Sequence, residues 1–460
     1  MRKKIVQTLK ITCLRYPNKG IAFFDDKEVE VKNGLPGQLV EVEMSRKKKR
    51  WVGKILRVVE PAKEEIISSC PDFGICGGCS FQNIPYEYEL ILKRDMVKQL
   101  LDSLNSLELI KPSCLPDMTN FLIVPAPCDS GYRNKMEFSF GDEGKNGRLT
   151  LGIRKRDQYY EVVVPAECTL IPADFRELAL YTLDFFRDTN ETFYHRMRHT
   201  GSLRYLILRR GEFSGELLIN LVTTDEIRVE LSEWAQGLLT LADKLSGRIT
   251  GILHTISDSV ADAVVPKECR ILWGRDYFYE KICGLTFSIS TFSFFQTYSA
   301  GAELLYQTVR EWVGMDVGTI YDLYCGTGTI AQILSTCAKE VIGIELVPEA
   351  IEAAKENARI NEIENVSFIA GDVLKVMDSF KEPDIIILDP PRNGIHPKAL
   401  KNIIELGARK IIYVSCKPTS LTRDLVVLIE NGYQIEALRC HDMFPRTPHV
   451  EVVCLLVKNL

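Results

Sequence analysis

Short runs of alternating apolar and polar residues dominate the first sixty positions of the chain. Asn-Gly and Pro-Gly turns separate some of these runs, and the pattern predicts the strands of a small β-barrel over residues 1–61. The runs cover residues 5–13, 21–24, 29–31, 38–44 and 51–58. A basic stretch with a tryptophan, residues 46–51, is expected on a hairpin, where cations for phosphate groups lie beside a ring for base stacking.

The middle of the chain predicts an α+β domain over residues 62–285. Residues 86–105 have the apolar spacing of an amphipathic helix. Five later runs have strand composition, residues 135–140, 149–154, 159–163, 203–210 and 216–223. Cations alternate in residues 132–135 and 204–210, which predicts an exposed charged face, suited to RNA or simply solvated.

From residue 286 onward, strand-like and helix-like runs alternate regularly, which predicts a Rossmann-like α/β domain over residues 286–460. Three buried runs, residues 320–323, 384–388 and 411–415, end in residues that carry chemistry. Because ligands bind at the carboxyl ends of parallel strands, these three ends are expected to open on one crevice.

Cys416 ends the last of these runs and is the candidate nucleophile. A cysteine inside the cell is more often a small buried hydrophobe. Its place at a strand end, opposite the Asp389-Pro390-Pro391 turn, favours catalysis instead.

A glycine turn, residues 324–328, follows the run 320–323 and predicts a nucleotide cofactor site. Glu345 ends the next strand about twenty residues later, where an acid accepts both ribose hydroxyls of an adenosine group. Asp372 follows the strand 366–370 and is placed to accept from the adenine amine. A dinucleotide is the competing ligand, although Ala331 stands where that fingerprint has its third glycine.

Composition limits the class of protein. The 460 residues are too many for one core, and 46% hydrophobic with 26% charged residues is typical of a globular protein. No apolar run is long enough to span a membrane, and residues 1–7 lack a signal-peptide core, so a cytoplasmic protein is expected. Residues 1–60 hold 15 Lys/Arg against 7 Asp/Glu, in a chain of net charge −5, so a polyanion is expected to dock at this end.

Four of the 14 cysteines are candidate metal ligands: Cys70, Cys76, Cys79 and Cys168. Close cysteines with glycine spacers let several thiolates converge on one centre. Four thiolates suit either zinc or an iron-sulfur cluster, and the spacing does not decide between them.

Taken together, these residues resemble the RNA (uracil-5-)-methyltransferases, in particular the branch with an N-terminal TRAM domain and an iron-sulfur cluster that modifies 23S ribosomal RNA. The resemblance covers nearly the whole chain and implies S-adenosylmethionine and a [4Fe-4S] cluster as cofactors. It rests on the four cysteines, Phe294-Phe295-Gln296, Asp322 to Gly328, Asp389 to Arg392, Ser415 to Pro418 and His449-Val450-Glu451.

Carried over position by position, the resemblance implies methionine-cofactor contacts at Gln296, Tyr324, Thr329, Glu345 and Asp389, with Asp372 matched less securely. It implies Cys416 as the nucleophile on carbon 6 of uracil. Glu451 is the candidate base for the carbon 5 proton. Lys417 departs from the family, in which asparagine often stands there.

The expected partner is RNA, with 23S ribosomal RNA first, no membrane and no obligate protein partner. Two alternatives stay open: the same reaction on a transfer RNA uridine, and an RNA-binding protein without activity. The TRAM-like segment and the cysteines argue against the first alternative, and the intact set of site residues argues against the second.

Overall fold

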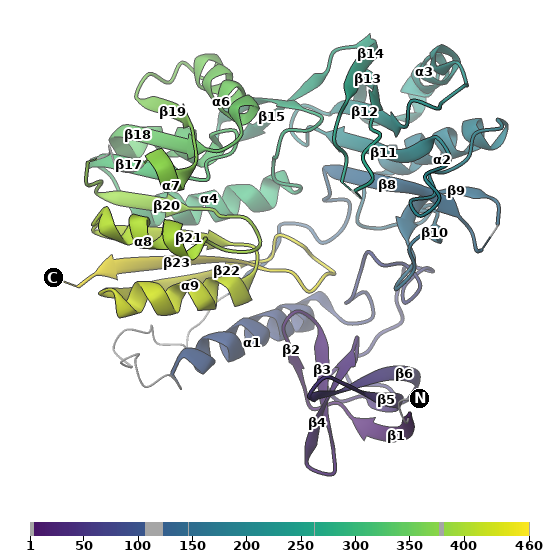
Figure 1. The fold of residues 1–460 in the computed structure, drawn as a ribbon, viewed down its shortest axis with the longest axis horizontal. Coiled ribbons are helices and arrows are strands. Elements are labelled where there is room, and N and C mark those ends of the chain that lie inside the picture. The colour runs from purple at the N-terminus through teal and green to yellow at the C-terminus, as the bar shows by residue number, and fades with distance from the viewer. Residues whose placement is uncertain (1–3, 106–122, 146, 262, 377–380, 460) are drawn as a thin grey trace.

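The computed structural model describes residues 4–105, 123–145, 147–261, 263–376 and 381–459. Three large sheets and one two-stranded sheet organise the chain (Figure 1). None of the helices within these ranges combines the length and the apolar character needed to cross a lipid bilayer.

The first sheet has six strands in the order β1-β5-β6-β4-β3-β2. Its core forms because every second residue of β5 points inward, and Val40, Val42 and Met44 are fully buried. The strands are β1 (Ile5–Lys10), β2 (Cys13–Arg15), β3 (Lys19–Phe24), β4 (Lys27–Lys32), β5 (Leu39–Lys47) and β6 (Arg50–Glu60). The predicted strands of this region are confirmed, whereas its assignment as a TRAM barrel stays a prediction.

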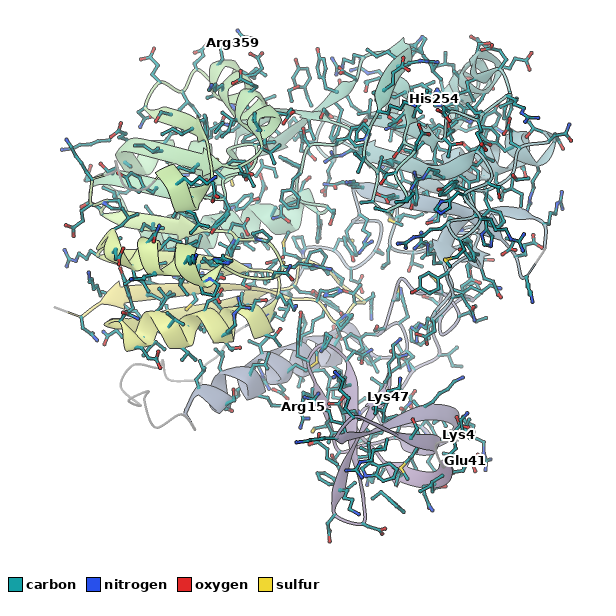
Figure 2. The ribbon with its side chains drawn as sticks, viewed as in Figure 1. Lys4, Arg15, Glu41, Lys47, His254 and Arg359 are labelled. Atoms are coloured by element: carbon teal, nitrogen blue, oxygen red, sulfur yellow. The ribbon has the colours of Figure 1, made fainter. Side chains whose placement is uncertain are left out.

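The basic hairpin lies where the sequence places it. Lys47 pairs with Arg50 across β5 and β6, and Lys48 in the turn has a φ of 55°. Residues 46–50 are exposed, and Lys47 projects from the small β domain (Figure 2). Trp51 packs partly against the domain core, so only part of its ring is open to a ligand.

The second large sheet has seven strands in the order β10-β9-β8-β11-β12-β13-β14. One face packs on α2 (Ala173–Arg187) and α3 (Leu231–Leu239) in a common core. The strands are β8 (Lys135–Asp142), β9 (Leu149–Arg154), β10 (Val162–Val163), β11 (Leu203–Arg210), β12 (Glu216–Thr223), β13 (Arg248–Ile256) and β14 (Glu268–Gly274). The predicted run 159–163 is thus shorter than expected, and the other four predicted strands are confirmed.

The prediction of an exposed charged face is wrong for the cations of β11. Arg204 and Arg209 are only 4% and 2% exposed. Arg204 donates to the carbonyls of Ser257 and Ala261, and Arg209 donates to three carbonyls in residues 290–293. Because a buried guanidinium needs acceptors, these side chains stabilise neighbouring loops and do not face a ligand.

The third large sheet has eight strands in the order β19-β18-β17-β20-β21-β23-β22-β7. Apart from β7, its strands follow the hairpin of β15 (Tyr277–Ile282) and β16 (Leu285–Ser290), and the first five strands in this order are parallel. Its strands are β7 (Ile123–Val124), β17 (Val317–Leu323), β18 (Ala338–Glu345), β19 (Val366–Ala370), β20 (Ile385–Leu388), β21 (Lys410–Ser415), β22 (Tyr433–His441) and β23 (Glu451–Lys458).

Helices cover both faces of this sheet. One core joins it to α1 (Tyr86–Asn105), α8 (Pro397–Glu405) and α9 (Pro418–Glu430). The other core contains α4 (Ser299–Val313), α5 (Thr329–Ile333) and α6 (Pro348–Ile360), and α7 (Val373–Val376) follows β19. The Rossmann-like fold is confirmed, and so is the helix over residues 86–105. That helix packs against α9, although it precedes the C-terminal region by almost two hundred residues (Figure 1).

Candidate active site

Four strand ends meet at one edge of the third large sheet. The parallel strands β17, β20 and β21 end there, and the antiparallel β23 starts there. Ser415 pairs with Val452, so the next residue, Cys416, lies beside Glu451. Leu388 pairs with Tyr413, which brings Asp389 to the same edge. The structure therefore brings together the three residues that the sequence placed in the reaction.

Burial makes the thiol of Cys416 hard to ionise. Burial raises the pKa of Cys416 to about 11, and the carboxyls of Glu451 and Asp389 add to the increase. The guanidinium of Arg392 opposes the increase, because its side chain hydrogen-bonds the sulfur and its charge favours the thiolate. Arg392 is therefore a cation that favours the thiolate of Cys416.

The two carboxyl groups are also hard to ionise. Burial raises the pKa of Glu451 to about 8, with a further increase from Asp389 and a decrease from Arg392. Burial raises the pKa of Asp389 to about 7. Two acids whose pKa values lie near neutrality can exchange protons with a substrate at physiological pH, as general acid-base catalysis requires.

Two residues at this site were not assigned a role from the sequence. Arg392 was visible only as the fourth residue of the Asp-Pro-Pro-Arg motif, which gives no direction for its side chain. Tyr16, in the loop after β2, is buried, and the charges of Cys416, Glu451 and Arg392 act on its hydroxyl. No motif could have shown that the small β domain reaches the active site, because the contact joins segments four hundred residues apart.

The glycine turn after β17 forms the floor of the predicted cofactor site. Gly326 has a φ of 54°, and a side chain there would meet no atom within 4 Å, so the space above the turn is open. Glu345 accepts from the amide of Gly326 at 3.2 Å and so lies beside this space. Tyr324 has a φ of 69°, which is uncommon outside glycine and often marks a functional turn. Thr329 begins α5 directly after the turn.

The remaining predicted cofactor residues lie around the same edge. Asp372 follows β19, accepts from the amide of Leu374 at 3.0 Å and acts electrostatically on Tyr324. Gln296 is 9% exposed, and its side chain hydrogen-bonds the hydroxyl of Tyr306. Besides burial, the charges of Asp389 and Glu451 raise the pKa of that hydroxyl.

Asp322 is a further acid that the sequence did not single out for a role. It is fully buried at the end of β17, and its Oδ2 accepts from the amide of Ala331 at 2.9 Å. Its Oδ1 has no hydrogen-bond partner among the residues that the structure describes. An unpaired buried oxygen next to the open turn fits a site that receives a polar ligand with hydrogen-bond donors.

The four candidate metal ligands line one cavity. Cys70, Cys76, Cys79 and Cys168 all border it, between the start of β8 and the end of β9. The loop is held in place because Arg156 donates to the carbonyl of Cys76 at 3.0 Å. Within the described ranges, however, no three His, Cys, Asp or Glu side chains are arranged to hold a single metal ion.

The chain is similar in sequence to a family of known proteins. A family model described as tRNA (Uracil-5-)-methyltransferase matches residues 211–373, and a methyltransferase-domain model matches residues 316–438. A protein of Clostridium tetani named as an uncharacterized RNA methyltransferase is 45% identical over 456 residues, 98% of each chain. A protein of the same description from Caldanaerobacter subterraneus is 43% identical over the full length of both chains.

The chain belongs to the RNA (uracil-5-)-methyltransferase family.

A solved structure agrees with this membership. The tRNA (uracil-54, C5)-methyltransferase of Pyrococcus abyssi, in complex with S-adenosyl-L-homocysteine, aligns with a TM-score of 0.77 and 26% identity, covering 98% of this chain and 100% of that one. The chain is thus an S-adenosylmethionine-dependent RNA methyltransferase.

The contact between Arg392 and Cys416 predicts the reactivity of the thiol. Arg392→Met removes a charge-assisted hydrogen bond and should raise the pKa of Cys416 by about 1 unit, slowing its alkylation roughly tenfold at neutral pH. Iodoacetamide labelling of Cys416, followed by peptide mass spectrometry, measures this rate. Arg359→Met, which removes an exposed cation on α6, is the control and should leave labelling unchanged. Equal rates for both variants would show that Arg392 does not activate the thiol.

Proposed function

We propose that this enzyme methylates carbon 5 of a uridine in 23S ribosomal RNA through a covalent adduct with Cys416. The observation that supports the proposal best is the register of β21 and β23, which places Cys416 beside Glu451 with Asp389 at the next strand end. A nucleophile and a base at one edge, with a carboxyl beside them that can contact the methyl donor, are what this reaction needs.

The proposed reaction uses each group once. The Cys416 thiolate adds to carbon 6 of uracil, which forms a C–S bond and moves the electrons of the C5–C6 double bond toward carbon 5. Gln296, Tyr324, Glu345 and the neighbouring contacts Thr329, Asp372 and Asp389 would hold S-adenosylmethionine as the methyl donor. Carbon 5 would take its methyl group, so that the C5–CH3 bond forms while the S–CH3 bond breaks and S-adenosylhomocysteine leaves. Glu451 then takes the proton from carbon 5, the double bond reforms, and the C–S bond breaks to return the thiolate.

RNA must reach this site with the target base turned out of its stack, because a stacked base does not expose carbon 6. A groove lined in part by Thr297, the residue after Gln296, supports such a path. It passes Thr297, Arg133 and Lys135 and continues along the sheet past Arg154 and Tyr205. A neighbouring cavity, which shares Arg154 and Tyr205 with this groove, is lined by Tyr159, Tyr160, Tyr194 and Arg196, a mixture suited to bases and phosphates.

We also propose three domains: a TRAM-like RNA-binding domain over residues 1–61, a central domain over 62–285 and the catalytic domain over 286–460. The exposed cations of the hairpin 46–50 support the first assignment. The cavity between Cys70, Cys76, Cys79 and Cys168 suits a [4Fe-4S] cluster in the central domain, since four thiolates complete the coordination of such a cluster.

A transfer RNA substrate is the second candidate. The matching family model and the aligned Pyrococcus abyssi enzyme are both described by action on transfer RNA. Mapping 5-methyluridine in ribosomal and transfer RNA from a deletion strain separates the two candidates, because only the true substrate loses the modification.

Variants of Cys416 and Glu451 are expected to stop the reaction at different steps. Cys416→Ala should bind cofactor and RNA but form no adduct, because the attacking sulfur is gone. Glu451→Gln should transfer the methyl group but fail to remove the carbon 5 proton, so a methylated RNA–protein adduct should accumulate. Denaturing electrophoresis with a labelled methyl donor detects it. Normal turnover by Glu451→Gln would show that another group removes the proton.

The cysteine cavity predicts iron. Protein purified without oxygen should be brown and carry about four iron and four sulfide ions per chain. Cys79→Ser should lose them and the associated visible absorption, whereas Cys269→Ser, at an exposed cysteine elsewhere, should keep both. Stoichiometric zinc without iron would contradict the assignment.

The basic hairpin predicts salt-dependent RNA binding. Replacing Lys47, Lys48 and Lys49 by glutamine should lower RNA affinity and reduce the slope of log affinity against log salt by about 2, since each lost phosphate contact removes roughly 0.7. Cofactor binding should not change. Lys355→Gln with Lys401→Gln, on exposed helix surfaces, is the control. A slope equal to that of the wild type would mean that the hairpin does not touch phosphates.

A further inference from the structure

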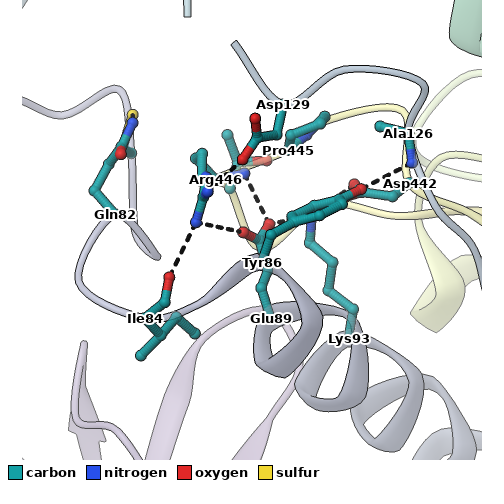
Figure 3. Close-up of polar contacts among 12 residues, drawn as sticks. Gln82, Ile84, Tyr86, Glu89, Lys93, Ala126, Asp129, Asp442, Pro445 and Arg446 are labelled. Carbon is teal, nitrogen blue, oxygen red and sulfur yellow. Dashed lines mark hydrogen bonds and ion pairs between the residues drawn. The ribbon is translucent and has the colours of Figure 1, made fainter. Parts of the chain in front are cut away.

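Helix α1 meets the segment before β23 through a buried polar network (Figure 3). Lys93 is fully buried, and its Nζ lies 2.8 Å from Glu89 Oε1 and 2.6 Å from Asp442 Oδ1. It also donates to the carbonyl of Phe444 at 3.0 Å, and the hydroxyl of Tyr86 donates to Asp442 Oδ2 at 2.8 Å. Such a network costs desolvation energy and is tolerated only where its members are well paired.

Arg446 lies at the centre of this contact. Its amide donates to Glu89 Oε1 at 2.7 Å, and its guanidinium donates to the carbonyl of Ile84 at 3.0 Å. The guanidinium also pairs with Asp129, from a third segment of the chain. Its φ of 67° is left-handed, a conformation that a non-glycine residue keeps only where its surroundings enforce it.

The carbonyl of Arg446 extends the contact to the four-cysteine loop. It accepts from the amide of Ser80 at 2.8 Å and from that of Phe81 at 3.2 Å, the two residues that follow Cys79. The neighbouring carbonyl of Pro445 accepts from Tyr132 at 2.9 Å. Segment 442–450, which leads directly into Glu451, is therefore held by α1, by the loop before β8 and by the four-cysteine loop.

Arg446 is not among the charges that act most strongly on the reacting groups. The cation that influences both Cys416 and Glu451 is Arg392. An effect of Arg446 on catalysis must therefore pass through the position of segment 442–450. Displacing a catalytic group by about 1 Å can lower the rate roughly a hundredfold, so holding segment 442–450 in place should keep Glu451 aligned for proton removal.

We infer that Arg446 is a positioning residue for proton removal: its guanidinium fastens the segment that carries Glu451 to the carbonyl of Ile84, just before α1, and to Asp129. Its backbone contacts to Glu89, Ser80 and Phe81 remain when the side chain is replaced. The inference rests on the proposed function, in which Glu451 takes the carbon 5 proton. Loss of Arg446 should leave cofactor binding and the attack of Cys416 largely intact while Glu451 loses its alignment. Proton removal should then become slow relative to methyl transfer.

The test compares Arg446→Ala and Arg446→Lys in the full chain. For Arg446→Ala, we expect at least tenfold slower release of methylated RNA and an accumulating methylated adduct. The dissociation constants for the cofactor and, without methyl donor, for RNA should stay within about twofold of the wild type. Arg446→Lys keeps the positive charge and should release methylated RNA at a rate between those of Arg446→Ala and the wild type. Arg439→Ala is the matched control, because it removes a similar ion pair between Arg439 on β22 and Glu311 on α4. This variant should release RNA normally.

Asp129→Asn is a milder variant that weakens the grip on Arg446 without touching Glu89 or Lys93. It should show the same accumulation to a smaller degree, which keeps the inference testable if Arg446→Ala unfolds. Unchanged release in folded Arg446→Ala, or an equal slowing of methyl transfer and release, would overturn the inference. Wild-type enzyme that forms no 5-methyluridine would instead overturn the proposed function, so the two failures are distinct.

Discussion

The antiparallel pairing of β21 with β23 is the constraint on which the active site depends. Parallel strands alone would bring Asp389 and Cys416 to one edge, but Glu451 reaches that edge only because β23 runs in the opposite direction and starts there. A shift of one residue would turn Glu451 to the other face of the sheet. The continuous apolar run after Glu451, buried on both faces, resists such a shift because it would disturb two cores at once.

Burial then sets the acid-base properties of the site. The pKa of Cys416 rises to about 11 and that of Glu451 to about 8, so neither group is fully ionised at neutral pH in the free enzyme. The charge of Arg392 lowers the pKa of both groups and so partly offsets the effect of burial. In the proposed mechanism, a base with a pKa near 8 would bind the carbon 5 proton more strongly than an ordinary carboxylate does, which favours removal of that proton.

Much of this arrangement was predictable from the sequence. Strand ends, the glycine turn and the helix over residues 86–105 follow from apolar periodicity, and the structure brings Asp389, Cys416 and Glu451 together. Periodicity does not show which segments cover a face of a sheet. The burial of Arg209 on β11 against loop carbonyls was therefore missed. Nor does periodicity show contacts between distant segments, such as the buried ion pair of Lys93 on α1 with Asp442.

The central claim is that carbon 5 of uracil exchanges its hydrogen for a methyl group. RNA carrying uridine with tritium at carbon 5 tests it directly, because methylation there must release that tritium to water. The account predicts one tritium released for each methyl group incorporated by the wild-type enzyme, and no methyl incorporation by Cys416→Ala. Methyl incorporation without tritium release would place the new methyl group on another atom and contradict the account.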